Sequence, residues 1–311
     1  MTANFGDTPC QRSSSARIVS ASRRTDIPAF YAEWLLNRLH EGYVLTQNPY
    51  NAKQIKHVSL LPQDVHCLVL WSKNPQPLLA RTNELSSLGF PCLMHFSLLP
   101  YNTTWHPHLP PLDALVDTFC SFEQSWGKTG VIWRYDPIIL NDVTTTAWHA
   151  EHFEQLCIKL QHVTDTVVIS FVDSYRHLPQ GLLRPVSEEA MYQTAAVLGT
   201  IASKYGLVAQ TCCEAMDFSS VGVHQGACID IRRIEMLSGQ ELHIIRDQNQ
   251  RPLCGCAASV DIGMYNTCGH GCAYCYATRS TKSSERNVRA HNPYSALLIE
   301  SSGMKPETSF E

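Results

Sequence analysis

Val65-His66-Cys67-Leu68-Val69-Leu70-Trp71 is an apolar run that the polar residues Ser72-Lys73-Asn74-Pro75 follow directly. It lacks the strict alternation of polar and apolar residues that marks a strand with one wet face. Such a run is typical of a parallel strand covered on both faces. In α/β folds ligands bind beyond the carboxyl ends of such strands. The stretch therefore predicts a buried strand that leads into a ligand-binding rim.

The same pattern recurs along the chain. The other predicted strands are 18–22, 92–97, 131–133, 166–171, 207–211 and 259–265. Helical patterns lie between several of them, at 31–40, 112–122, 145–162 and 187–204. Strand–helix alternation repeated six or seven times predicts an α/β fold that is a (β/α) barrel or partial barrel, with a doubly wound open sheet as the alternative.

Charged or polar side chains stand at the ends of most of these strands. They are Arg23, Arg24, Asp26, Lys73, Asn74, His95, Arg134, Asp136, Asp173 and Glu214. Any one of them is explained by the usual polarity of a βα-loop. A set that converges on one rim predicts a lined site, for which the catalytic or pocket residues are Arg23, Arg24, Asp26, Lys73, Arg134 and Asp136.

Composition describes an ordinary soluble enzyme. The chain has 311 residues, of which 44% are hydrophobic and 17% charged, and a formal net charge of −4. We expect one domain at 17–300, with a metal-binding region at 207–280 and disordered tails at 1–16 and 301–311. The acidic balance gives no reason to expect membrane-surface binding and makes nucleic acid a minor possibility. No signal peptide or membrane span is visible, which predicts a cytoplasmic protein.

Cysteine usage is unusual. Eight of the 13 cysteines fall between Cys212 and Cys275. The odd total, the clustering and the missing export signal argue against a disulfide framework and favour metal ligands. Two of the scattered cysteines, Cys67 and Cys92, lie in apolar runs and are predicted to be small core residues.

The tightest group is Cys268-Gly-His-Gly-Cys272-Ala-Tyr-Cys275. Three thiolates at this spacing can hold three corners of a [4Fe-4S] cluster and leave the fourth iron free. A structural zinc site would normally need four ligands. We therefore predict an open cluster, with zinc binding or inert thiols as the alternatives. His270, inside the motif, is expected to face solvent.

A second group precedes the triplet. Cys254 and Cys256, together with Cys228 and one of Cys212 or Cys213, make four possible ligands. Four thiolates would close either an auxiliary iron–sulfur cluster or a tetrahedral zinc site, and ordinary packing cysteines are the alternative. Neighbouring charges that could orient these ligands, or could simply be surface charges, are Asp247, Arg251 and Asp261.

The triplet, with Tyr274 before its last cysteine and Tyr276-Ala277 after it, resembles the cluster loop of the radical S-adenosylmethionine (SAM) enzymes, in the YCYA variant of spore photoproduct lyase-like members. The resemblance implies a [4Fe-4S] cluster whose unique iron binds SAM. It further implies a 5′-deoxyadenosyl radical and an electron donor such as flavodoxin or ferredoxin. Tyr274 and Tyr276 could stack on the adenine, and core packing is the competing role.

The chain departs from that superfamily in two respects. The motif begins at residue 268, whereas most members carry it after the first strand. A circular permutation would account for this, because the last strand of a barrel lies beside the first. The chain also has no Gly-Gly pair, so the superfamily's Gly-Gly-Glu signature for the methionine amine is missing.

As a whole the chain resembles the bacterial domain-of-unknown-function 1848 family. The matching segments are 20–30, 71–75, 134–137, 228–230 and 250–277. That family is uncharacterised, and its terminal cysteines are similar to radical SAM cluster ligands. The resemblance therefore implies the metal site and the fold but no substrate.

Together these patterns favour a radical SAM-like enzyme acting on an unknown substrate, with Tyr135 or Tyr175 as a hydrogen-atom relay. The alternative is a non-catalytic protein, either an iron–sulfur redox or electron-transfer protein or a zinc-stabilised scaffold. The strand-end charges count against it, because an electron carrier needs only a cluster near its surface. A metal-independent α/β enzyme is a third option, but no nucleophile elbow or phosphate loop supports it.

Overall fold

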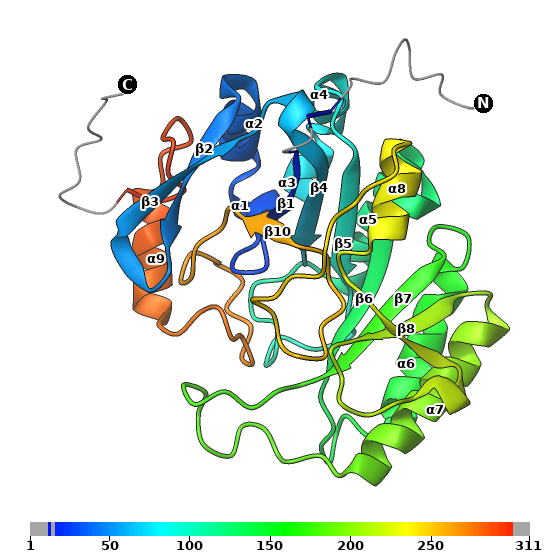
Figure 1. Ribbon diagram of the computed structural model, residues 1–311. Helices are drawn as coiled ribbons and strands as arrows, with labels where there is room; N and C mark the ends of the chain where they lie inside the picture. The colour runs from blue at the N-terminus through cyan, green and yellow to red at the C-terminus, as the bar shows by residue number, and fades with distance from the viewer. Residues whose placement is uncertain (1–11, 14–15, 301–311) are drawn as a thin grey trace.

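The computed structural model describes residues 12–13 and 16–300, and the tails predicted to be disordered lie mostly outside this range. Within it, eight parallel strands form one sheet (Figure 1). They are β1 (Arg17–Ala21), β4 (Val65–Ser72), β5 (Cys92–Ser97), β6 (Val131–Ile138), β7 (Thr166–Phe171), β8 (Val208–Cys212), β9 (Val223–Gly226) and β10 (Ser259–Asp261). All seven predicted strands are present.

Helices follow most of the strands. They are α1 (Ile27–Phe30), α2 (Ala32–Glu41), α3 (Gln76–Leu79), α4 (Thr82–Ser87), α5 (Leu112–Gly130), α6 (Thr146–Leu160), α7 (Glu188–Lys204), α8 (Ile231–Ser238) and α9 (Thr281–Ala290). The four predicted helices correspond to α2, α5, α6 and α7. Local signals explain their ends: Ser187 caps the first turn of α7 by accepting from the amide of Ala190, and Gly42 ends α2 in the left-handed conformation.

The sheet is open. Its order is β10-β1-β4-β5-β6-β7-β8-β9, so β9 and β10 form its edges and the predicted barrel does not close. From β1 to β9 the order follows the chain, whereas a doubly wound sheet reverses at a switch point. Only β10 departs from the chain order of the strands, because it pairs in parallel with β1, with Val19 opposite Val260. The strand before the cysteine motif therefore lies beside the first strand of the chain.

The two faces of the sheet are covered differently. One face packs against α2, α5, α6 and α7 in the main core. We call the other the loop face; its buried residues are Ile18, Val69, Leu93, Ile132 and Val168. It is covered by the segment 228–257, which contains α8 and otherwise little regular structure. Burial on both faces explains why the strands lack strict alternation, and the buried Cys67 and Cys92 confirm the prediction that they are core residues.

The sequence patterns missed the antiparallel hairpin of β2 (Tyr43–Asn48) and β3 (Asn51–Ser59). Most of β3 is exposed, so it carries polar residues on both faces and no core pattern. The helices α1, α3 and α4 were missed because they have only four to six residues, and α8 and α9 were missed because they bury only one or two residues each. No helix in the described part of the chain is long and apolar enough to cross a membrane.

Candidate functional site

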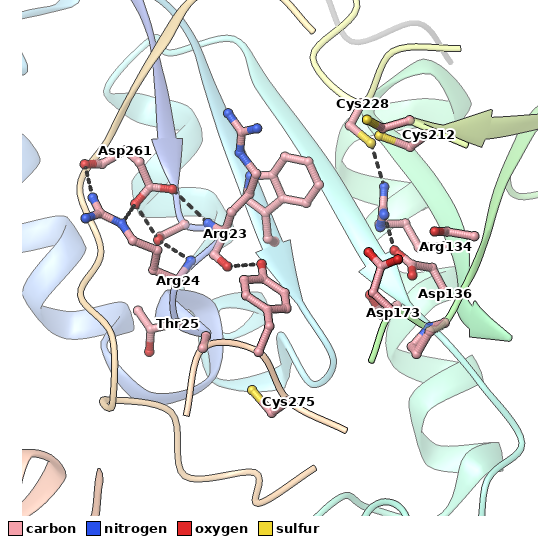
Figure 2. A pocket seen from close by; sticks show the side chains of 18 of the residues that line it. Arg23, Arg24, Thr25, Arg134, Asp136, Asp173, Cys212, Cys228, Asp261 and Cys275 are labelled. Carbon is pink, nitrogen blue, oxygen red and sulfur yellow. Dashed lines mark hydrogen bonds and ion pairs between the residues drawn. The ribbon is translucent and has the colours of Figure 1, made fainter. Parts of the chain in front are cut away.

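A cavity of about 1000 Å³ opens at the carboxyl ends of the strands. All six predicted pocket residues line it, and so do the eight clustered cysteines and both motif tyrosines. Figure 2 shows its two sides: Arg23, Arg24 and Asp261 lie on one, and Arg134, Asp136, Cys212 and Cys228 on the other. Of the other strand-end residues, Asp173 lines the cavity, whereas Asn74, His95 and Glu214 do not.

Asp261, at the end of β10, organises the first side. Its carboxylate accepts hydrogen bonds from Arg24 Nε at 3.0 Å, from Ser22 Oγ at 2.6 Å and from the Arg23 amide at 2.9 Å. The β1 loop is thereby tied to the strand that precedes the cysteine motif. The Arg23 side chain stays available, because among the described residues its guanidinium donates only to Ser259, and it lies 5.7 Å from the centre of the Trp71 ring.

Asp26 joins three loops beneath the motif. It caps α1 through the Ala29 amide at 3.0 Å, accepts from the Lys73 amide at 2.8 Å and pairs with His270 Nε2 at 2.7 Å. Burial raises the pKa of Asp26, but the hydrogen bond and charge of His270 and the Lys73 amide outweigh it and hold the pKa below its usual value. Its ionised carboxylate therefore fixes the cysteine loop against β1 and β4.

His270 corrects the sequence-based expectation. It is only 3% exposed and does not face solvent, because Asp26 binds one ring nitrogen and Phe30 packs against the ring. Its other nitrogen, Nδ1, is buried and has no hydrogen-bond partner among the described residues, and the same holds for Thr25 Oγ1. Both residues line the cavity.

Cys268, Cys272 and Cys275 are half-buried and lie in the cavity wall. Burial raises the pKa of Cys272 to about 11, with Lys73 acting against it, and burial and Asp26 raise the pKa of Cys268 well above its usual value. The thiols of Cys268 and Cys272 are therefore protonated near neutral pH and are poor nucleophiles. Binding a metal would deprotonate them. Their chemistry suits ligation rather than covalent catalysis.

Of the tyrosines considered in the sequence analysis, some line the cavity and one lies in the core. The hydroxyl of buried Tyr274 bonds His106 Nε2 at 2.6 Å, and Lys73 Nζ lies 5.5 Å from the centre of its ring. Tyr276 is exposed at the cavity, and its hydroxyl donates to the carbonyl of Arg23. Tyr175 also lines the cavity.

Tyr135 does not. It lies in the main core with its hydroxyl 2.8 Å from His149 Nδ1, because its side chain points to the helix-covered face of β6. The structure therefore removes Tyr135 as a candidate relay.

Arg134 dominates the opposite side. Its Nη1 donates to Cys228 Sγ at 2.9 Å, and its Nη2 pairs with Asp136 (Figure 2). The guanidinium also lies 5.3 Å from the centre of the Trp71 ring, on whose plane His95 stacks. His95 in turn bonds the Cys228 carbonyl at 2.6 Å. Arg134 thus links the second cysteine group to the cavity.

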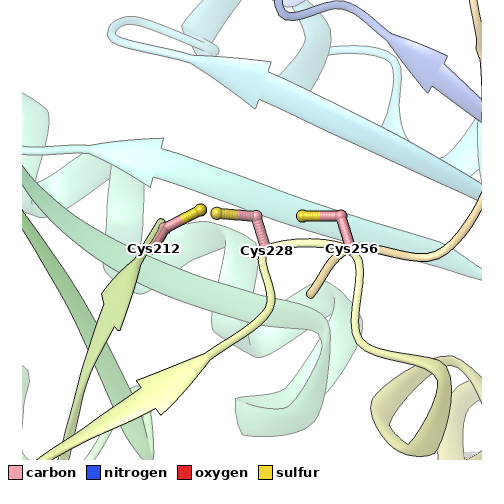
Figure 3. A group of neighbouring side chains, drawn as sticks. All are labelled: Cys212, Cys228 and Cys256. Atoms are coloured by element: carbon pink, nitrogen blue, oxygen red, sulfur yellow. The ribbon is translucent and has the colours of Figure 1, made fainter. Parts of the chain in front are cut away.

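That second group is compact. The sulfurs of Cys212, Cys228 and Cys256 lie within 4.8 Å of one another, and the three side chains point toward one another in Figure 3. The group could hold a metal. Cys254 also lies beside Cys212 and Cys256. Cys213 lies near Arg251, Cys254 and Cys256 but is not one of the three cysteines whose sulfurs lie within 4.8 Å of one another. The geometry therefore favours Cys212 over Cys213 as the cysteine that joins Cys228, Cys254 and Cys256 in the predicted ligand set.

The predicted orienting charges have separate partners. Arg251 pairs with Asp173 at 2.9 Å, and the Asp247 amide donates to the Cys256 carbonyl. Sequence reasoning missed Ser22, Thr25 and Trp71 as cavity residues. Ser22 and Thr25 stand among the charged residues of the 20–30 segment, and Trp71 is the last apolar residue before a polar cluster. Their position at the end of a strand is therefore the signal that could have identified them as cavity residues.

The family model described as "Domain of unknown function (DUF1848)" matches residues 18–277. This range contains β1 to β10 apart from one residue of β1, and every cysteine of both groups. A search of the curated proteins found no match.

Proposed function

The chain belongs to the DUF1848 family, whose function is unknown, and we propose that it is an iron–sulfur enzyme of the radical SAM type. The observation that carries the proposal is the position of the CxxxCxxC triplet. Its three thiols lie in the wall of a cavity of about 1000 Å³ that also presents Arg23 and Lys73. Three ligands leave one iron of a [4Fe-4S] cluster free to bind a second molecule from that cavity.

The residues present fit such a group. The three thiols are neighbours, since Cys272 and Cys275 are among the charges that raise the pKa of Cys268, and Cys275 is among those that raise the pKa of Cys272. Two buried polar atoms beside them, His270 Nδ1 and Thr25 Oγ1, are without partners in the described chain. Buried polar atoms in proteins are nearly always hydrogen-bonded, and because these two residues line the cavity, a group or a water bound there would supply the missing partner.

When bound, a [4Fe-4S] cluster would supply one electron to the sulfonium of SAM, releasing methionine and a 5′-deoxyadenosyl radical. The protein's own contribution is binding and orientation. Cys268, Cys272 and Cys275 would hold the cluster. Within the described chain Lys73 forms no salt bridge, and its ammonium lies over the Tyr274 ring. It is therefore the cation best placed to bind a carboxylate of a cosubstrate.

Tyr175 is the remaining relay residue. Burial and the neighbouring Asp173 raise the pKa of its hydroxyl to about 12, so the phenol stays protonated at neutral pH. Its hydroxyl donates to Asp173 at 3.3 Å and its ring lies 5.9 Å from that of Tyr276 at the cavity. A neutral phenol can give up a hydrogen atom, which is the step assigned to Tyr175.

An iron–sulfur redox protein is the second candidate, favoured by the same cysteines. It accounts less well for the cavity, because electron transfer requires no volume for a substrate. Zinc-stabilised scaffolding accounts for neither the cavity nor the three-ligand motif.

The test is anaerobic purification followed by iron and sulfide quantitation and a dithionite-driven assay for 5′-deoxyadenosine. Iron, sulfide and deoxyadenosine together support the enzyme. Iron without deoxyadenosine favours the redox protein, and zinc alone removes both proposals.

Variants localise the result. Cys272→Ala should lose the iron and sulfide of the open cluster and all deoxyadenosine formation. Cys120→Ala, on α5 and away from the cavity, is the matched control and should keep both. Full iron retention in Cys272→Ala would refute the ligand assignment.

A further inference from the structure

The cysteine group around Cys228 is the strongest feature that the proposed function leaves unused. The sulfurs of Cys212, Cys228 and Cys256 all lie within 4.8 Å of one another (Figure 3). Sulfurs bound tetrahedrally to one zinc ion at about 2.3 Å lie about 3.8 Å apart. The cysteine ligands of a [4Fe-4S] cluster bind separate irons and radiate from its centre, so their sulfurs stand farther apart. The observed spacing fits one shared ion.

Cys254 is the fourth cysteine of the group. Its side chain lies beside those of Cys212 and Cys256, but its sulfur is outside the set that lies within 4.8 Å of one another, so it would have to move toward Cys228 to complete a tetrahedral site. Thiols are weak donors and weak acceptors, so four buried sulfurs gain little from hydrogen bonds to one another. A divalent ion would replace these weak contacts with four metal–sulfur bonds. Four protein ligands fill a tetrahedral site and leave no position for substrate.

The ligands come from segments that need a cross-link. Cys212 ends β8, Cys228 lies between β9 and α8, and Cys254 and Cys256 follow α8. The stretch 239–258 contains no helix or named strand, and its isolated bridge joins Arg246 to Ala257. Even so, the three ligands after β9 are at most 4% exposed. An ion bound here would fasten this irregular stretch over the loop face of the sheet.

The surroundings suit a charged sulfur site. Arg134 Nη1 donates to Cys228 Sγ at 2.9 Å, and the Ile229 amide donates to Cys256 Sγ at 3.5 Å. Four thiolates around a divalent ion carry a net charge of −2, so a buried guanidinium beside them offsets part of that charge. Hydrogen bonds to ligand atoms are the usual means by which proteins orient a metal site.

We infer that Cys212, Cys228, Cys254 and Cys256 bind one zinc ion in a closed, four-sulfur site separate from the open cluster. The bound ion holds the segment 239–258 in place and, through Cys228, positions Arg134 at the cavity. The inference does not depend on the radical chemistry, and zinc can be bound whether or not SAM is.

The experiment uses the full chain in two forms, the wild type and a Cys268→Ala/Cys272→Ala/Cys275→Ala variant that cannot hold the open cluster. Both should contain one zinc per chain, and zinc-edge X-ray absorption should fit four sulfur neighbours. Iron with inorganic sulfide in the triple variant would overturn the single-ion site in favour of a cluster. Absence of any metal from the triple variant, together with no uptake of added zinc, would also overturn it.

Single variants identify the ligands. Cys212→Ala and Cys254→Ala should reduce zinc content to background, whereas Cys213→Ala, one residue from a ligand, should keep one zinc per chain. The reverse result for Cys212 and Cys213 would overturn the ligand set. Because loss of the ion could unfold these variants, cobalt uptake by the wild-type chain is measured as well. Cobalt should exchange for the zinc and give the visible absorption of a tetrahedral sulfur site, and an octahedral spectrum would refute the inference.

Discussion

Replacing Asp26 tests whether one buried carboxylate fastens the cysteine motif to the sheet. Asp26 accepts from the Ala29 amide at 3.0 Å, from the Lys73 amide at 2.8 Å and from His270 Nε2 at 2.7 Å. An ionised carboxylate only accepts, so His270 carries its hydrogen on Nε2. Asp26→Ala leaves all three donors without their acceptor.

The cost follows from the three bonds. Loss of a helix cap destabilises by about 1 kcal/mol. Each buried donor left unsatisfied, here the Lys73 amide and His270, costs about 1–3 kcal/mol. The sum is about 4 kcal/mol, a large share of the roughly 5–15 kcal/mol by which a domain is stable. Asp26→Asn keeps one acceptor oxygen and loses the charge, so we expect about half that loss.

Urea unfolding of the full chain, at equal metal content, measures both variants. The matched control is Asp230→Ala, which removes a cap on α8 that accepts from the Arg232 amide alone at 2.9 Å. It should cost about 1 kcal/mol. If Asp26→Ala costs no more than Asp230→Ala, the carboxylate does not hold His270 and Lys73, and the reasoning fails.

Three further predictions concern the packing around the site. Burial lowers the pKa of His149 to about 4, so the unfolded chain binds that proton first, and His149 contributes a stability loss of about 3 kcal/mol as the pH drops from about 6.5 to about 4. Other buried histidines, such as His106 with a pKa of about 2, add their own losses over the same range, so urea titrations should show the stability of the wild type falling by about 3 kcal/mol more than that of His149→Gln. Gly199→Ala places a Cβ 2.4 Å from the Val221 carbonyl oxygen, so the thermal unfolding temperature should fall although alanine favours helices. The control Ser203→Ala, at an exposed position of the same helix, should leave the unfolding temperature unchanged. Arg134→Met leaves Asp136 without its partner and should destabilise by about 3 kcal/mol; an unchanged urea midpoint would contradict the pairing.

The four-residue edge strand β9 has no apolar run and was missed, but the other seven strands of the sheet were predictable because both faces of the sheet are covered. That burial imposes continuous apolar runs, and each of the seven runs became a strand. The hairpin of β2 and β3 left no such trace, because it is largely exposed and packs little apolar surface. The sequence also could not show whether the sheet closes into a barrel, because pairing of the two edge strands depends on the curvature of the whole sheet and not on either strand.

The pocket residues were predictable from position alone. Parallel strands bring their carboxyl ends to one edge, so residues such as Arg23 and Arg134, more than 100 positions apart, were expected on one rim. Their partners were not predictable. That Arg24 pairs with Asp261 while Arg134 pairs with Asp136 depends on the β1–β10 register and on side-chain directions.

The sequence alone determined where the clustered cysteines and most of the buried strands lie, because thiol spacing and apolar runs are local properties of consecutive residues. Only the folded molecule decided that Cys212, and not Cys213, lies with Cys228 and Cys256. It also decided that His270 is buried against Asp26 and that Tyr135 lies in the core. These outcomes follow from contacts between segments up to 244 residues apart, and no local pattern records which distant side chain will be packed against a given one.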